Sequence, residues 1–417
     1  MANQKPSLTE NLNSFLDGHV YPEKKIIHSN QQGLIDRAIC PILHLVCEQD
    51  DRFQTDVPTT SDCRFGVTAS DEHRFDILVP LPNLLTVKRS DIPVDDGRCV
   101  TFTDSCQSDN PYVTPLQGFG YLTTDTDVTF LQDLSCTNRQ QKDDGQGSLL
   151  LPGKVLRRFH RLVQEAVSTL EKKCFWEREP TVYEVKVNRE GPAVTLTFLL
   201  NGNTFIVSLI PAVNIQQWPE GMVQRWPQCA WMTMDRLVSL KSHFYLFAIG
   251  PKGREDSRKM WCSCFYPGEI LLASQADIGS STQTCRRHAL NALLAVCEEN
   301  REDFSPVGAR IIRTVFLHQC VQYPQDEDWE PGKLGRAFVD LFLALIQALL
   351  KGTIAHFFLP ETNLLAAHDK RDLKPVADHL KAILNDIVQH PEKTYFLGDR
   401  NGRKQYTRLK TTCAPKF

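Results

Sequence analysis

A single carboxylate interrupts an apolar, strand-like stretch at residues 74–81, which read RFDILVPL. Side chains alternate between the two faces of a strand, so Arg74 and Asp76 share one face. A buried carboxylate without a partner costs free energy, so Asp76 needs one. A metal ion used in nucleotide chemistry would be such a partner, and the guanidinium of Arg74 or a neighbouring backbone N–H would be another. The residues of this stretch leave these alternatives open.

Length and composition are those of an ordinary globular protein. The 417 residues suffice for two or three domain-sized units, and 41% of them are hydrophobic and 23% charged. The net charge of −3 gives no global field that attracts nucleic acid. Any binding to nucleic acid therefore needs a local basic patch.

The sequence favours a cytoplasmic or nuclear protein and leaves the choice between these two open. Its first residues lack the apolar core of a signal peptide. The most apolar run, residues 337–350, contains Asp340 and Gln347 and is too short to cross a bilayer, so we expect a buried helix and no transmembrane segment. The 14 cysteines are then expected to be reduced thiols. Cys262 and Cys264 have no second pair or nearby histidine at zinc-ligand spacing, so no zinc site is expected.

The first half of the chain mixes helix and strand patterns. A helix is expected over residues 25–50, although Pro41 must kink or interrupt it, and another begins at Pro152. The strand at 74–81 is expected to join a sheet with three later strands at residues 181–187, 193–200 and 204–213.

From about residue 267 the apolar spacing becomes helical, which predicts an α+β fold. The helical segments are 284–299, 307–321, 334–350 and 373–389, of which 334–350 is apolar almost all round and is expected at the centre of a bundle. The expected organisation is a flexible N-terminus at 1–24, a mixed α/β lobe at 25–265 with a mobile loop at 138–148, a helical lobe at 266–392, and a basic tail at 393–417.

Two groups of cations are candidates for binding anions. Lys154, Arg157, Arg158 and Arg161 lie at helical spacing on the helix that begins at Pro152. They form either a solvated surface or a contact with phosphate backbone. The tail carries seven Lys and Arg residues against one acid, Asp399. It is either a solvated extension or a segment that contacts nucleic acid or an acidic partner.

Several stretches, taken together in their order, resemble the Mab-21 family, which shares its fold with cyclic GMP–AMP synthase. The resemblance covers roughly residues 30–395. Its pieces are RFDI at 74–77 with Leu81, the helix at 152–167, VSLIPAV at 207–213, RWP at 225–227, WCSCF at 261–265 with Glu269, CRR at 285–287, CVQYP at 320–324 with Asp328 and Trp329, and HFFLP at 356–360 with Asn363.

The resemblance implies a bilobal nucleotidyltransferase fold. An N-terminal mixed α/β lobe would carry a twisted sheet and a spine helix, and a C-terminal lobe would be a helical bundle. Active members of the family hold two Mg²⁺ ions with three carboxylates, because hard cations that bridge phosphate oxygens need carboxylate ligands on rigid strands.

This sequence departs from that carboxylate set. The acid-x-acid pair is replaced by Arg74 and Asp76, and Ser208 stands at the position of the third acid. The Gly-Ser turn that cradles the triphosphate is missing from the loop at 59–66, and the His-then-Cys-Cys zinc insertion of cyclic GMP–AMP synthases has no counterpart. Rescue by Asp71 or Glu72 is an alternative, but Glu72 would lie about 13 Å from Asp76 along a strand.

Three readings follow. The leading one is a catalytically degenerate Mab-21-like protein that binds a nucleotide-like ligand or a macromolecular partner. The second is an active, Mg²⁺- or Mn²⁺-dependent nucleotidyltransferase similar to cyclic-dinucleotide synthases, with Asp76 as a metal ligand and nucleic acid as its activator. The third is a non-catalytic nucleic-acid-binding module that uses the basic tail and the basic stripe, by which we mean Lys154, Arg157, Arg158 and Arg161.

Overall fold

The structure is a computed structural model, and its described residues form two compact units. The described residues are 7–15, 38–55, 64–65, 74–84, 100–104, 118–124, 131–136, 148–172, 182–200, 203–215, 218, 223, 226, 231–233, 235, 244–251, 255–277, 283–300 and 307–390. The sheet unit comprises Asn30–Gln224 and Lys241–Gly268, and the helical unit comprises Met1–Ser29, Arg225–Leu240 and Glu269–Phe417. A unit with a sheet and a unit of helices confirm the α+β fold class.

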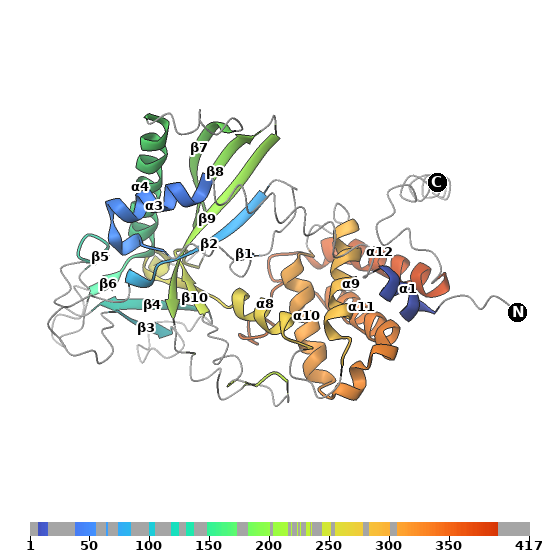
Figure 1. Cartoon of the computed structure of the whole chain (residues 1–417). Helices are drawn as coiled ribbons and strands as arrows, with labels where there is room; N and C mark the ends of the chain where they lie inside the picture. The colour runs from blue at the N-terminus through green and yellow to red at the C-terminus, as the bar shows by residue number, and fades with distance from the viewer. Residues whose placement is uncertain are drawn as a thin grey trace, which may run out of the picture. The chain divides into compact units, whose positions relative to one another are not determined.

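The sheet unit is built around β9 (Asn203–Ile215), the longest described strand. β2 (Arg74–Pro80) runs parallel to β9, whereas β8 (Ala193–Leu200) pairs with it antiparallel and carries β7 (Val182–Glu190) on its other side (Figure 1). The strand at 74–81 therefore joins the sheet of the three later strands, as predicted. The remaining described strands of this eleven-stranded sheet are β1 (Arg64–Phe65), β3 (Val100–Asp104), β4 (Phe119–Thr124), β5 (Ser135–Cys136), β6 (Ser148–Leu150), β10 (Phe244–Phe247) and β11 (Trp261–Cys264).

α4 (Pro152–Lys172) is the spine helix of this unit and packs against β7 and β8 (Figure 1). Pro152 begins the helix, where its missing N–H has no intrahelical role. An apolar stripe along α4 is buried, and α3 (Cys40–Gln49) packs on the same helix. Phe53 stacks on Phe159 with ring centroids 5.9 Å apart. Short 3-10 helices complete the unit: η3 (Asp51–Phe53), η5 (Pro82–Leu84) and η9 (Glu255–Lys259).

The interruption expected at Pro41 coincides with the start of α3. α3 begins at Cys40, so Pro41 lies in its first turn, and residues 38 and 39 before it are π-helical. The part of the predicted helix at residues 25–37 lies outside the described residues. The N–H groups of a first turn have no acceptor within the helix, and a proline therefore costs nothing there.

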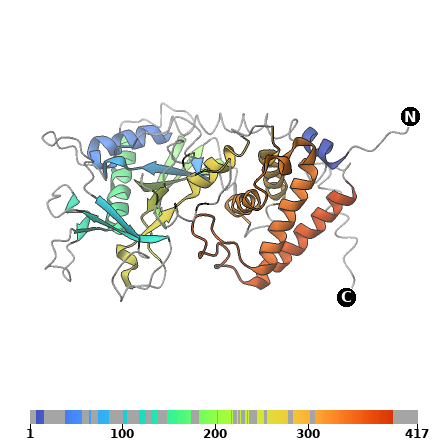
Figure 2. The same ribbon diagram turned by 90° about the horizontal axis from the view of Figure 1, so that it is seen from below.

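α11 (Leu334–Lys351) is the central helix of the helical unit, as predicted. It contacts α1 (Leu8–Phe15), α9 (Arg286–Glu299), α10 (Ala309–Gln322) and α12 (Lys370–Gln389). Figure 2 shows α12, in red, lying along α11, in orange. The unit also contains α8 (Tyr266–Ser274), whose first residues belong to the sheet unit, η11 (Asp326–Trp329) and η12 (Pro331–Lys333).

The expected flexible N-terminus contains a docked helix. Ser7 and Glu10 form a capping box at the start of α1, with the Ser7 N–H donating to the Glu10 carboxylate at 2.7 Å and the Glu10 N–H donating to Ser7 Oγ at 3.3 Å. Leu12 is completely buried, and Thr9 Oγ1 accepts the N–H of Gly335 at 3.0 Å. The polar composition of residues 1–24 gives no sign of these contacts, because α1 makes them with α11, which is far away in the sequence.

Several predictions lie outside the described residues: rescue by Asp71 or Glu72, the loop at 59–63, residues 138–147 of the expected mobile loop and the basic tail at 393–417. Ser148, the last residue of that expected loop, begins β6. Of the helices that the structure does describe, none combines the length and the apolar character that crossing a membrane requires.

Candidate functional site

The positions that sequence assigned to metal carboxylates meet where β2 pairs with β9. Asp76 is paired with Ser208, and Arg74 with Ile206, in the parallel register. Ser208 is also paired with Thr195 of β8. The backbone therefore aligns residues 76, 208 and 195 in one row across three strands. Sequence reasoning missed Thr195, because only the pairing of β8 with β9 reveals its place in the row.

Ser208 and Thr195 lie in the interior of the sheet unit. Each is only 4% exposed, and Val207 and Leu209, which alternate with Ser208 along β9, are fully buried. Thr195 Oγ1 makes no hydrogen bond to any residue that the structure describes. A buried hydroxyl without a partner costs about 1–3 kcal/mol. The row thus holds hydrogen-bonding capacity that the described part of the fold does not use.

The donor chemistry of this row does not fit two Mg²⁺ or Mn²⁺ ions. Asp76 is the only carboxylate among the three aligned residues, and Ser208 and Thr195 have neutral hydroxyls. Divalent cations of this kind take several carboxylate oxygens. Two residues before Asp76 on the same strand stands Arg74, so this pair of positions supplies one acid where a metal site of this kind needs two. Across the described parts of the chain, no three His, Cys, Asp or Glu side chains gather as metal ligands.

The basic stripe on α4 is split between interior and solvent. Lys154 Nζ donates to the carbonyl oxygen of Ser135 at 2.7 Å, and Arg158 Nε donates to Asp50 at 2.8 Å. Arg157 is exposed. Arg161, with 60% of its side chain exposed, lies 3.8 Å from Glu165. Two of the four cations are thus engaged within the fold, and two face solvent.

A buried ion network explains where Arg158 points. Asp50 receives hydrogen bonds from Arg52 and Arg158, and Arg52 also donates to Asp133 at 2.6 Å. Burial acts to raise the pKa of Asp50, but the hydrogen bonds from both arginines outweigh it and hold that pKa below its usual value. The hydrogen bond from Arg52 likewise lowers the pKa of Asp133. This network joins η3 to α4, so its role is structural.

The helical unit contains a second buried ionisable cluster. Glu269 is completely buried, with its carboxylate oxygens 3.6 Å from His356 Nε2 and 3.8 Å from Arg310 Nε. Burial raises the pKa of Glu269 against the opposing effect of Arg310 and Arg313. Burial, with the charges of Arg310 and His318, lowers the pKa of His356 to about 3. Glu269 and His356 each lie in a stretch that resembles the Mab-21 family, but the sequence did not indicate that the two side chains lie close together.

A buried arginine joins the segment Arg225–Leu240 to the helices. Arg286 is completely buried and donates to Asp326 at 2.8 Å. Its guanidinium lies 5.4 Å from the ring centroid of Trp231 and 5.6 Å from that of Trp329. Such contacts are favourable when the cation is desolvated. Trp226 of the same segment packs on Phe358, with ring centroids 5.7 Å apart. These tryptophans act in packing.

Two families of known domains match the chain. Residues 66–273 match the Mab-21 protein nucleotidyltransferase domain, and residues 285–382 match the Mab-21 protein HhH/H2TH-like domain. The two matches follow the order of the sheet and helical elements.

Curated proteins with related sequences carry two names. The cyclic GMP-AMP synthase of Mus musculus is 25% identical over 236 residues, which are 53% of this chain and 44% of that protein. The protein mab-21-like of Anopheles gambiae is 24% identical over 242 residues, 56% of this chain and 61% of that protein. The cyclic GMP-AMP synthase of Sus scrofa is 23% identical over 251 residues, 56% of this chain and 48% of that protein. The chain thus spans about half the length of the curated relatives it matches.

Proposed function

The chain belongs to the Mab-21 family, and from this premise we propose that it is a non-catalytic nucleotidyltransferase-fold protein that binds a nucleotide-like ligand in its sheet unit. The observation that carries the proposal is the pairing of Asp76 with a neutral residue, Ser208. A catalytic centre with two metal ions needs several carboxylates at such a place. One carboxylate, with Arg74 two residues away on the same strand, supports binding without turnover.

The row supplies chemistry that suits a nucleotide without metal. The hydroxyls of Ser208 and Thr195 can donate hydrogen bonds to phosphate oxygens or exchange them with sugar hydroxyls. The unused hydroxyl of Thr195 would gain a partner, which offsets part of the cost of its burial. Arg74 can attract a phosphate group by its charge.

An active nucleotidyltransferase is the second candidate, and two observations favour it. Two of the relatives are named cyclic GMP-AMP synthase, and Asp76 remains in the strand. This candidate requires further carboxylates from outside the described residues. The third candidate function is binding of a macromolecular partner instead of a nucleotide. The fold of the chain is the one observation that supports it.

A thermal-shift titration of the full-length chain with ATP, GTP and their mixture tests the proposal, with Mg²⁺, with Mn²⁺ and with EDTA. A ligand at a hundred times its Kd stabilises the folded state by about 2.7 kcal/mol. We expect a shift that persists in EDTA and is weakened by Thr195→Val. Thr197→Val is the matched control, because Thr197 lies two residues along the same strand, and it should keep the shift.

Mass spectrometry of the same mixtures separates the candidates. A linear or cyclic dinucleotide that forms with Mg²⁺ or Mn²⁺ and disappears in Asp76→Asn would overturn the proposal in favour of an enzyme. The absence of a shift with every nucleotide would also overturn it, and would direct the search to a macromolecular partner.

A further inference from the structure

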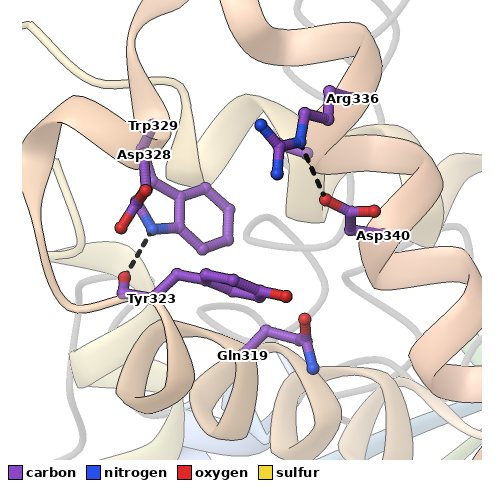
Figure 3. Close-up of a pocket in the computed structure, with 7 residues that line it drawn as sticks. Gln319, Tyr323, Asp328, Trp329, Arg336 and Asp340 are labelled. Carbon is purple, nitrogen blue, oxygen red and sulfur yellow. Dashed lines mark hydrogen bonds and ion pairs between the residues drawn. The ribbon is translucent and has the colours of Figure 1, made fainter.

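A shallow pocket opens on the helical unit between α10, η11 and the start of α11 (Figure 3). Trp329 and Tyr323 form an aromatic wall, and Asp328 and Asp340 bring negative charge to the same pocket. Arg336 and Asp340 come from the α11 side and Gln319 from α10. Aromatic rings beside carboxylates are suited to a planar cation.

The aromatic wall is held firmly. Trp329 is only 3% exposed, and its Nε1–H donates to the carbonyl oxygen of Tyr323 at 2.8 Å. The indole also contacts Phe316, with ring centroids 6.2 Å apart, and the buried guanidinium of Arg286. A wall fixed in this way binds a ligand without the entropic cost of ordering it.

The pocket already contains a guanidinium that can be replaced. Arg336 lies 3.5 Å from Asp340, with 74% of the Arg336 side chain exposed (Figure 3). Exposed pairs at this spacing contribute little free energy, about 0.3–0.5 kcal/mol. Arg336 therefore shows that a guanidinium fits beside Asp340, and it can move aside for another one.

We propose that this pocket binds an arginine side chain from the chain's own C-terminal segment, residues 393–417. Charge complementarity supports this occupant. The C-terminal segment has seven Lys and Arg residues and one acid. Residues 326–330 have four acids, of which Asp326 is paired with Arg286 and Glu330 with Lys333, and Asp328 lines the pocket together with Asp340. Three of the seven are arginines, namely Arg400, Arg403 and Arg408.

The segment starts at the correct end of the helical unit. A side chain at Gly352 would come within 2.9 Å of Lys370, so the end of α11 meets the start of α12. α11 has 18 residues and α12 has 20, which correspond to about 27 and 30 Å of helix. Since α12 packs along α11 from that meeting point, its last turn is expected near the first turns of α11. Arg400 lies eleven residues beyond Gln389, a distance along the chain that can span up to about 36–40 Å. That reach exceeds the 10–12 Å diameter of a helix several times.

Limited trypsin digestion of the full-length chain tests the proposal, with cleavage after Arg400, Arg403 and Lys404 followed by mass spectrometry. The Asp328→Asn, Asp340→Asn double variant should be cleaved there at least about threefold faster than the wild type, because the bound arginine loses its charge partners. The matched control is Glu361→Gln with Asp378→Asn, which removes the same charge from two exposed positions of the helical unit. Equal cleavage of the pocket variant and the wild type would overturn the proposal.

Carbodiimide coupling provides a second measurement that does not depend on cleavage. It joins carboxylates to neighbouring lysines, so Lys404 or Lys410 should couple to Asp328 or Asp340. A mixture of isotopically labelled and unlabelled protein distinguishes links within one chain from links between chains. Links within one chain would support the proposal. Links exclusively between chains would overturn it and assign the pocket to a second copy.

Discussion

Asp76 of β2 is paired with Ser208 of β9 in the parallel register of the sheet. If the missing carboxylates are what prevents metal binding, then Arg74→Asp together with Ser208→Asp should restore it. In EDTA we expect this variant to be less stable than the wild type by about 1–4 kcal/mol, because it places a negative charge at position 208, which is buried. With Mn²⁺ and ATP it should gain about 1–3 kcal/mol more than the wild type does, as measured by thermal shift.

The control for this prediction is Arg74→Asn together with Ser208→Asn, which leaves Asp76 as the one carboxylate of the three positions. Asparagine has the shape of aspartate and no charge, so this variant should show no gain that depends on Mn²⁺. Equal responses of the aspartate and asparagine variants would indicate that the row is not a degenerate metal site.

The network around Asp50 should dominate the acid stability of the sheet unit. Asp50→Asn breaks a buried pair and should lower the free energy of unfolding at neutral pH by about 3 kcal/mol. Because the folded pKa of Asp50 lies below its ordinary value, this contribution is present above that ordinary value and is lost as the pH falls through the folded pKa. The difference between wild type and variant should therefore shrink below about pH 4, which urea unfolding at several pH values would measure.

Asp51→Asn is the matched control for Asp50→Asn, because Asp51 is adjacent and exposed. It should change stability by less than about 0.5 kcal/mol. A loss as large as that of Asp50→Asn would show that the network is not the cause.

The docking of α1 depends on a small set of contacts with α11. A Cβ at Gly335 would lie 2.9 Å from Thr9 Oγ1, so Gly335→Ala should displace α1. Leu12→Ala should lower the free energy of unfolding of the helical unit by about 2–4 kcal/mol, because it removes a buried side chain that holds α1 in place. Hydrogen exchange of residues 8–15 should become faster in both variants. Asn13→Ala, at an exposed position of the same helix, should leave that exchange unchanged.

The sequence was sufficient to predict the elements in which a regular apolar pattern extends over many residues. α4 and α11 were predicted because their stripes extend over many turns, and the strand at residues 74–81 was predicted from its apolar run. α1 was missed because its eight residues are too few for a periodic signal. Its Ser7–Glu10 capping box was the signal that could have identified it.

The candidate site was only partly predictable, because it depends on contacts between distant residues. The alignment of Asp76 with Ser208 required the pairing of β2 with β9, and Thr195 required that of β8 with β9. Helical spacing placed Lys154 and Arg158 in an exposed stripe. Spacing alone could not show that their hydrogen-bond acceptors, 19 and 108 residues away in the sequence, hold them in the fold.

His356 should make the helical unit sensitive to mild acid. Its Nδ1 accepts the N–H of Phe358 at 3.0 Å, and its lowered pKa, about 3, keeps the folded imidazole neutral. The unfolded chain binds a proton below about pH 6.5, so stability should fall by up to about 1.4 kcal/mol per pH unit as the pH decreases from there. Glu269 has the opposite sign, because its raised pKa makes stability fall as the pH rises above its ordinary value.

The His356→Asn variant isolates the histidine, since an asparagine oxygen can accept the N–H of Phe358. As the pH falls from about 6.5 to about 4.5, the wild type should lose stability through His356 and the variant should not, so the free energy of unfolding of the variant should rise relative to that of the wild type. Glu269→Gln serves as the control, because it should leave the slope due to His356 in place. A difference that is constant with pH would show that His356 does not titrate as its burial requires.

Arg157 and Arg161 offer a test of the nucleic-acid reading that does not disturb the fold. They face solvent, whereas Arg158 is held by Asp50, so Arg157→Glu with Arg161→Glu should leave the thermal stability within about 0.5 kcal/mol of the wild type. Two solvent-facing cations on a chain of net charge −3 give few phosphate contacts, and we expect weak duplex binding that the double variant changes by less than about threefold. Fluorescence anisotropy with a DNA duplex at about 50 and 200 mM salt measures this. The opposite outcome is a steep fall of affinity with salt in the wild type and a shallower one in the double variant, with a difference in slope that corresponds to about two phosphate contacts. That outcome would establish the stripe as a nucleic-acid site.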